Sequence, residues 1–226
     1  MRIFFTLLFF LSFCLTSFSQ KDSLQLGDKY SDDQIYASIS YAQFNEQPNS
    51  ISKSNFSYAL SVGFIKDFIL NKQGNLSVAA GVGYGVDFFN HKLKVEEINN
   101  TTIFSSDNTI SGNLFKSHNL EFPLELRWRT STANKYNFWR VYAGIKFLYN
   151  IANKFQFEDA NNNSFSYSNI TSYNKFQYGL TLNVGWNTFN IHAYYALNSL
   201  FQSSARLNGQ RINVQPLRLG FIFYIL

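Results

Sequence analysis

The sequence predicts an all-β fold, namely an eight-stranded antiparallel up-and-down transmembrane β-barrel with a side-chain-filled interior. Three observations support this fold class. Eight segments alternate apolar and polar residues, their connections alternate between long and short, and all three tryptophans lie on the apolar side beside a short connection. Alternation with a period of two is the pattern of a strand with two unlike faces. Long loops at one rim and short turns at the other are typical of outer-membrane barrels.

The N-terminus predicts an exported protein. A basic residue precedes an apolar run over 3–15, and small residues lie before Gln20, as in a secretory signal peptide. The run is shorter than the ~20 residues of a spanning helix, and the bulky residue before Cys14 disfavours a lipoprotein. We therefore expect a signal peptide at 1–19, a periplasmic N-terminal segment at 20–33 and the barrel at 34–226.

Composition narrows the class of partner. The formal net charge is +5, but the lysines and arginines are scattered and form no run or stripe, which disfavours nucleic acid. Aromatic residues make up 19% of the chain although its mean hydropathy is −0.15. Abundant ring surface beside many polar residues fits strands with lipid on one side. The expected partner is therefore the outer-membrane lipid, and the expected location is the outer membrane.

The first four predicted strands lie between residues 35 and 129 and differ in how regularly apolar and polar residues alternate. The segment 35–44 is the weakest, while 56–64 alternates large apolar residues with Ser, Ala and Gly. The segment 76–88 sets Leu, Val, Tyr and Phe against Gly, Ser and Asp. In 120–129, written LEFPLELRWR, one face is wholly apolar and the other carries four charges around a proline.

The last four predicted strands repeat this pattern. They cover 139–147, 176–186, 189–198 and 216–225. Each is close to the ~9 to 11 residues that a tilted strand needs to cross a bilayer. No later apolar run is long enough for a spanning helix, and only helices and closed barrels satisfy every backbone hydrogen bond in lipid. We therefore expect these strands to close into a barrel.

The charged face of 120–129 can be explained in two ways. In a soluble sandwich its charges would face water, whereas in a small membrane barrel they would point into a narrow interior filled by side chains. Buried charges must be paired, so the barrel predicts a charge network in the lumen. Its expected members are Asp87, Glu121, Glu125, Arg127, Arg129, Arg140, Lys146 and Arg218.

The tryptophans predict an aromatic girdle. Trp128, Trp139 and Trp186 all fall on the apolar parity beside a short turn. Tryptophan favours the membrane interface, where its ring is buried and its N–H stays hydrated. We expect these three residues at the periplasmic rim, rather than in unrelated parts of a core.

The sequence gives no sign of an enzyme. The three histidines, His91, His118 and His192, are best explained as network or surface residues, since none has a nucleophile and an orienting carboxylate nearby in a motif. Neither a metal site nor a cofactor is predicted. The glycines of 81–85 superficially resemble a phosphate loop but lie on the inward side of a strand, where they favour close packing. No small-molecule substrate is indicated.

Four segments resemble the PorT family of outer-membrane barrels. They are LEFPLELRWRTS from Leu120, FWRVYAGIKF over 138–147, GFIKDF over 63–68 and YYALNSLF over 194–201. The resemblance implies a non-enzymatic accessory role in the type IX protein secretion system, with surface motility in gliding relatives, and other subunits of that system as partners. It implies no catalytic residues. The alternative is a general envelope or surface-adhesion barrel that works through its long loops.

Overall fold

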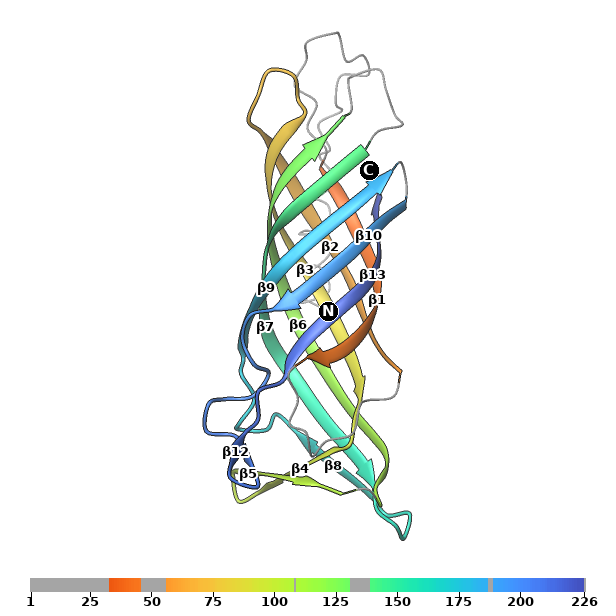
Figure 1. Ribbon diagram of the computed structural model, residues 1–226, viewed down its shortest axis with the longest axis vertical. Helices are drawn as coiled ribbons and strands as arrows, with labels where there is room; N and C mark the ends of the chain where they lie inside the picture. The colour runs from red at the N-terminus through yellow and green to blue at the C-terminus, as the bar shows by residue number, and fades with distance from the viewer. Residues whose placement is uncertain (1–32, 46–55, 108, 131–138, 187–188, 226) are drawn as a thin grey trace, which may run out of the picture.

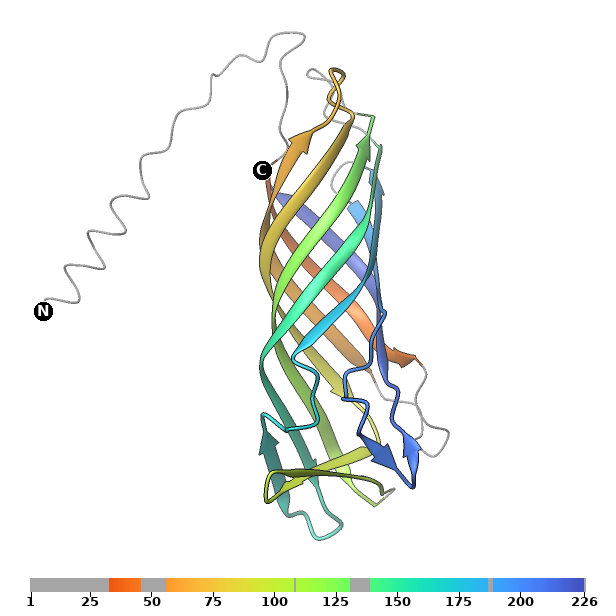
Figure 2. The same cartoon turned by 90° about the vertical axis from the view of Figure 1, so that its left-hand side faces the viewer.

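A computed structural model describes residues 33–45, 56–107, 109–130, 139–186 and 189–225. Eight of its strands form a barrel (Figures 1 and 2). They are β1 (Gln34–Asn45), β2 (Ser57–Ile69), β3 (Leu76–Asn90), β6 (Ser111–Arg129), β7 (Trp139–Glu158), β9 (Phe176–Trp186), β10 (Phe189–Ala196) and β13 (Gln215–Ile225). The predicted signal peptide, the periplasmic segment up to residue 32 and the turn at 187–188 lie outside the described residues.

The eight strands form an antiparallel meander. Each pairs with its neighbour along the chain: β1 with β2, β2 with β3, β3 with β6, β6 with β7, β7 with β9, β9 with β10 and β10 with β13. Pairing of β13 with β1, from Ile35 opposite Ile225 to Asn45 opposite Gln215, closes the ring. The predicted eight-stranded up-and-down barrel is confirmed.

The two rims of the barrel differ. At the turn end, the first strand begins and the last strand ends, and residues 71–75 alone separate Leu70 from Leu76, which are joined by a backbone hydrogen bond. At the opposite end the connections are long and carry strands of their own. These are β4 (Leu93–Ile98), β5 (Thr101–Ser106), β8 (Ser164–Ser168), β11 (Arg206–Leu207) and β12 (Gln210–Arg211). We call this end, with residues 91–107, 109–110, 159–175 and 197–214, the cap (Figure 2).

The expectation that these long connections are plain loops was wrong. Strands β4 and β5 form a hairpin around Asn99 and Asn100, both with positive φ, and β11 and β12 turn at Asn208 and Gly209, also with positive φ. Two successive residues with positive φ are the hallmark of the type I′ turn, whose twist matches that of paired strands. Strand β8 adds to the edge of β7. The cap is therefore folded β-structure.

Strands β6 and β7 extend far beyond the segments predicted for them. From the turn end to residue 120, the outward side chains of β6 are apolar. Closer to the cap, the side chain of Phe115 points inward and that of Lys116 points outward. On β7 a register shift opposite His118 and Asn119 leaves Ile151 as an extra residue, as in a β-bulge. Beyond it Phe155 is buried and Lys154 exposed. The two strands thus invert their polarity as they leave the apolar zone.

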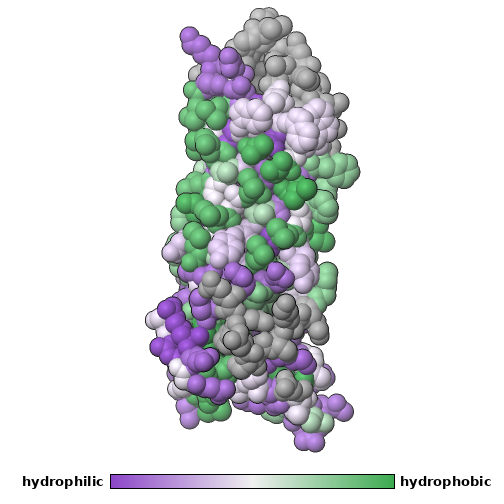
Figure 3. All heavy atoms as spheres, viewed as in Figure 1, coloured by the Kyte–Doolittle hydropathy of each residue, from purple (hydrophilic) through white to green (hydrophobic). Residues whose placement is uncertain are grey.

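The outer wall of the barrel carries a continuous apolar belt. Figure 3 shows hydrophobic residues over the middle of the molecule and strongly hydrophilic residues near both of its ends. The belt includes Leu126 (53% exposed), Val82 (51%) and Phe221 (51%). Apolar side chains exposed to this extent around a whole barrel are typical of contact with lipid rather than with water.

Glycines on the inner wall make room for large partners. A Cβ at Gly83 would collide with the hydroxyl of Tyr36, and one at Gly85 would collide with the carboxylate of Glu121. Small residues opposite bulky ones let a narrow barrel fill its lumen with side chains. The glycines of 81–85 therefore serve interior packing, as the sequence indicated.

Candidate functional site

The lumen nearest the turn end holds a cluster of charges centred on Asp67. Arg127 donates from Nη1 to Asp67 Oδ1 at 2.8 Å and from Nε to Glu125 Oε2 at 2.9 Å. Arg129 donates from Nη1 to the second oxygen of Asp67 at 2.9 Å. The Arg127 guanidinium also stacks 4.5 Å from the centre of the Tyr142 ring. One carboxylate thus bridges two buried arginines.

A second cluster lies in the lumen closer to the cap. Lys146 Nζ is 2.9 Å from Glu121 Oε2, and Arg218 Nη1 is 3.7 Å from the other oxygen of Glu121. Arg218 Nη2 is 2.9 Å from Asp87 Oδ1, and Asn119 donates to Asp87 Oδ2 at 2.9 Å. Four strands, β3, β6, β7 and β13, contribute these charges. Because each charge has an opposite partner, the cost of burying it is offset.

Seven of the eight sequence-predicted lumen residues lie in these two clusters. Arg140 is also buried, with its guanidinium 5.8 Å from the centre of the Tyr224 ring, which the Arg127 guanidinium also approaches at 5.4 Å. Sequence reasoning missed Asp67, because the second strand was expected to end at residue 64, whereas β2 runs to Ile69. Continued alternation, with Phe68 outward and Asp67 inward, was the signal that would have found it.

Polar side chains fill the lumen around these clusters. Asn183 donates to Glu125 Oε1 and to the Tyr224 hydroxyl, both at 3.1 Å, and its own carbonyl lies 2.5 Å from His192 Nδ1. A cavity beside these residues measures only about 10 Å³. A cavity of that size holds at most about one water molecule. The lumen around these residues is therefore packed with side chains.

The three tryptophans lie on the outer wall at the turn end. Trp139 and Trp186 are paired across β7 and β9, with ring centres 5.1 Å apart in an edge-to-face arrangement. Trp128 lies opposite Val141 on the neighbouring strand pair. All three are 42–52% exposed. Their placement agrees with a membrane-interface role at this rim, which remains a proposal.

The cap has an apolar core of its own. Phe115 and Phe155 stack at 4.2 Å between β6 and β7, and Phe201 packs against Phe104 at 5.0 Å. The core also includes buried Leu93, Val95, Ile170, Tyr173, Leu200, Leu207, Ile212 and Val214. Burial raises the pKa of Tyr173 to about 12. These contacts hold the long connections as one packed unit over the mouth of the barrel.

His91 is a buried titratable group of the cap. Its Nδ1 accepts a hydrogen bond from the backbone N–H of Leu93 at 3.1 Å, and its ring packs beside Phe44 and Phe115. Burial lowers the pKa of His91 from 6.5 to about 4. The folded cap therefore holds a neutral imidazole.

Acidification is expected to loosen the cap through His91. Because the folded pKa is depressed, the unfolded chain binds more protons between pH 6.5 and about 4, so stability is complete above pH 6.5 and falls as the pH drops through this window. Hydrogen–deuterium exchange of residues 93–106, normalised for intrinsic rates, should accelerate at pH 5 relative to pH 7. His91→Gln, which cannot be protonated, should remove this pH dependence. An equal acceleration in both proteins would exclude His91 as the cause.

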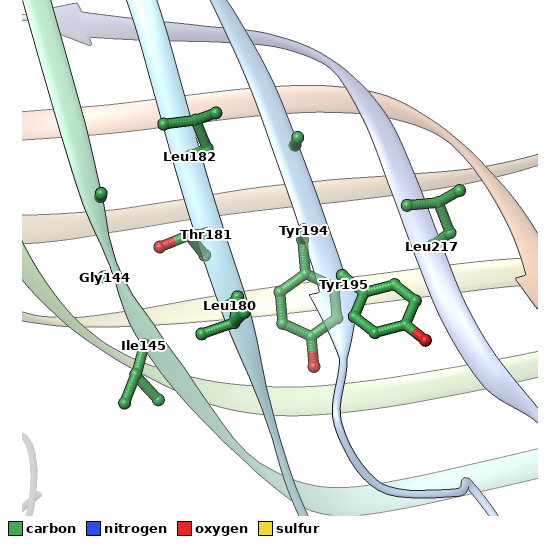
Figure 4. A pocket seen from close by; sticks show the side chains of 10 residues that line it. Gly144, Ile145, Leu180, Thr181, Leu182, Tyr194, Tyr195 and Leu217 are labelled. Atoms are coloured by element: carbon green, nitrogen blue, oxygen red, sulfur yellow. The ribbon is translucent and has the colours of Figure 1, made fainter.

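A depression of about 480 Å³ lies in the outer wall. Figure 4 shows its lining on neighbouring strands, with Ile145, Leu180, Leu182 and Leu217 among the labelled side chains. The small Ala143 and Ala193 lie among these larger residues. This mainly apolar depression lies within the belt and fits lipid acyl chains, and its polar side chains are those of Thr181, Tyr194 and Tyr195.

The three histidines lie in three different environments. His192 is part of the lumen network, His91 is in the cap core, and His118 faces outward beside Tyr84. Within the described ranges, no group of three His, Cys, Asp or Glu side chains could hold a metal ion. No described residue lies in a helix long and apolar enough to cross a membrane.

Two solved structures of Ail, the attachment invasion locus protein of Yersinia pestis, one in complex with the heparin analogue sucrose octasulfate, are similar to the chain at 14% identity and TM-scores of 0.34. The alignments cover 87% and 85% of this chain and 100% and 99% of the Ail chains. Similarity at this level does not extend to function. A comparison with curated proteins gives no match.

The family comparison is decisive. Residues 18–202 match the model of the outer membrane protein beta-barrel domain. The match covers every barrel strand except β13, the strand that closes the ring. The chain therefore belongs to the outer membrane protein beta-barrel domain family, and its barrel lies in the outer membrane.

Proposed function

We propose that this protein is a non-enzymatic surface barrel that binds a macromolecule outside the cell through its cap. The observation that carries the proposal is the packed apolar core of the cap above a lumen filled by paired charges. Because side chains fill the lumen around the charge clusters, the external surfaces are the better candidates for binding a partner. In outer-membrane barrels the long loops are extracellular and the short turns periplasmic, which supports a position of the cap outside the cell.

The cap presents apolar side chains on ordered hairpins. Ile98 is 49% exposed beside the β4–β5 turn, and Ile103 is 43% exposed on the return strand. Phe165 on β8 is 37% exposed and stacks on Phe157 at 5.1 Å. Exposed apolar and aromatic residues on a rigid support lose little conformational entropy on binding, and such residues anchor many protein interfaces.

The secretion role implied by the PorT resemblance is the second candidate. What favours it is the likeness of the four segments named above, together with the family match. Those segments run mainly through β2, β6, β7 and β10. They supply lumen charges such as Glu121 and Arg127 and the outward belt residues. The resemblance therefore concerns the wall and interior of the barrel more than any surface that would contact a secretion subunit.

A deletion strain can separate the two roles. The strain should be complemented with the natural protein or with Ile98→Ser/Phe165→Ser, which alters the cap surface and leaves its buried core intact. We expect the double variant to reach the outer membrane normally but to reduce attachment of cells to surfaces, with protein secretion unchanged. The measurements are adherent cell number and the amount of secreted protein in the medium.

Leu70→Ser is the control, because Leu70 is 58% exposed beside the short turn between β2 and β3 at the opposite rim. It should leave attachment unchanged. Normal attachment by both the cap variant and the deletion strain would refute the surface role. Loss of secretion in the deletion strain, restored by both variants, would instead establish the accessory secretion role.

A further inference from the structure

Lysines mark the outer wall where the apolar belt meets the cap. On β6 the outward apolar residues end at Leu120, and Lys116 follows on the same face towards the cap. Lys154 of β7 lies directly opposite Lys116 in the strand register. Lys175 precedes β9, and its carbonyl accepts a hydrogen bond from the backbone of Asn150 at 2.7 Å. The three ammonium groups therefore belong to neighbouring strands at one rim.

These lysines have no carboxylate partner among the described residues. The structure places Lys116 Nζ 5.2 Å from the centre of the Phe88 ring. Like charges directly opposite each other on antiparallel strands repel and destabilise the pair. By contrast, the charges in the lumen are paired at 2.8–3.7 Å. A bound anion would relieve the repulsion between Lys116 and Lys154.

A pocket of about 330 Å³ lies between β7 and the segment 169–175. It forms because Lys154 pairs with Ser168 on β8 and Tyr149 pairs with Phe176 on β9, while the intervening chain leaves the sheet to bury Ile170 and Tyr173 in the cap core. The bulge on β7 lies at the same level.

The lining of this pocket combines three kinds of group. Amides come from Asn150, Asn153 and Asn169, an ammonium comes from Lys175, and an aromatic ring comes from Tyr149. Lys154 follows Asn153 directly in the chain. Asn150 and Asn153 are buried, and their amides bond within the protein, from Asn150 Nδ2 to the His118 carbonyl and from Asn153 Nδ2 to Asn150 Oδ1, both at 3.0 Å. The lining groups that can meet a ligand are therefore the Tyr149 ring and the Lys175 ammonium, and an ammonium binds phosphate as a point charge. Tyr149 and Ile151 are exposed where the pocket meets the apolar belt.

We propose that this pocket, with Lys116, Lys154 and Lys175, binds the phosphate-bearing headgroup of an anionic glycolipid in the outer leaflet. The pocket lies above the belt on the lipid-facing wall, so a lipid whose chains rest on Ile151 and Phe176 would present its headgroup to the three lysines. A soluble anion would use the lysines but not the adjoining apolar surface. The proposal concerns the wall of the barrel and is independent of what the cap binds.

Binding of purified lipid to the delipidated, detergent-solubilised protein tests the proposal. The probe is diphosphorylated lipid A, and the readout is the apparent Kd from native mass spectrometry. Lys154→Gln and the triple variant with Lys116→Gln and Lys175→Gln are compared with the natural chain. We expect binding to weaken about fivefold per lysine removed, the effect typical of a basic residue near an anionic membrane surface.

Lys72→Gln is the matched control, because Lys72 is exposed in the turn between β2 and β3 at the other rim. It removes the same charge and should leave the Kd unchanged. All variants should keep the natural heat-modifiability, since the substituted side chains point away from both cores. Retained folding together with selective loss of lipid A binding supports the site.

Three outcomes would overturn the proposal. The first is a Kd that the triple variant does not change. The second is equal binding of phosphatidylcholine, which would mean that the belt holds any lipid. The third is complete displacement of lipid A by millimolar inorganic phosphate, which would identify a site for a free anion. Failure of the attachment experiment on the cap would leave these measurements unaffected.

Discussion

Asp67→Asn is expected to destabilise the barrel by about 3–5 kcal/mol, the usual cost of removing one partner from a buried ion pair. The substitution keeps the shape of the side chain but removes the charge that Arg127 and Arg129 share. Both guanidinium groups are almost completely buried, so water cannot replace the lost carboxylate. The measurement is the urea midpoint of the heat-modifiable gel shift in lipid vesicles.

Two controls accompany this prediction: one removes an exposed carboxylate, and the other removes an arginine that Asp67 binds. Asp107→Asn removes a carboxylate from an exposed part of the cap, where Asp107 accepts only local hydrogen bonds from Thr109; it should behave like the natural protein. Adding Arg129→Met to Asp67→Asn should recover part of the loss, because one orphaned charge is then gone. A natural midpoint for Asp67→Asn alone would show that the lumen pairs do not hold the barrel together.

Leu124→Arg is expected to cost about 2–4 kcal/mol, as for an arginine near the bilayer midplane on the lipid face of a barrel. Leu124 is 47% exposed at the centre of the outward apolar run of β6, between Ala80 and Ile145 on the neighbouring strands. The same urea titration in phosphatidylcholine vesicles measures the effect. Its physical cause is the transfer of a charge into lipid rather than a lost contact.

Leu124→Val is the matched control, since it keeps an apolar side chain in lipid and should be nearly silent. The pair of substitutions also separates a membrane barrel from a soluble one. On a water-facing strand an arginine would be tolerated at this position, so equal midpoints for the two variants would contradict the lipid-facing belt.

The barrel strands were predictable because lipid imposes one rule on the whole circumference. Wherever a strand crosses the belt, alternate residues must be apolar, and the segments 56–64 and 176–186 follow this rule closely. The rule ends at the cap. There Phe115 and Phe155 face inward, and Lys116 and Lys154 face outward. The cap ends of β6 and β7 therefore lack the outward apolar residues of a strand in lipid, and the sequence predicted loops there.

The lumen charges were predictable in kind but not in pairing. Inward parity identified Glu121, Lys146 and Arg218 as interior residues, yet which of them meet depends on the strand registers and on the closure of β13 against β1. Periodicity carries no information about these registers. The hairpin at Asn208-Gly209 did have a local signal, because this dipeptide favours the type I′ turn. The surrounding segment is polar, and a loop was predicted there instead.

The closure of β1 against β13 has a consequence for how the chain assembles. Every other barrel contact joins strands that follow one another along the chain, so seven hairpin pairings can form locally. The last pairing brings residues 35–45 to residues 215–225, and contacts of such long sequence separation form slowly because the entropy of loop closure is lost first. Until that seam closes, β1 and β13 are open edges that can pair with another chain. The pairing of the eleven-residue strand β13 with β1 therefore removes both open edges at once.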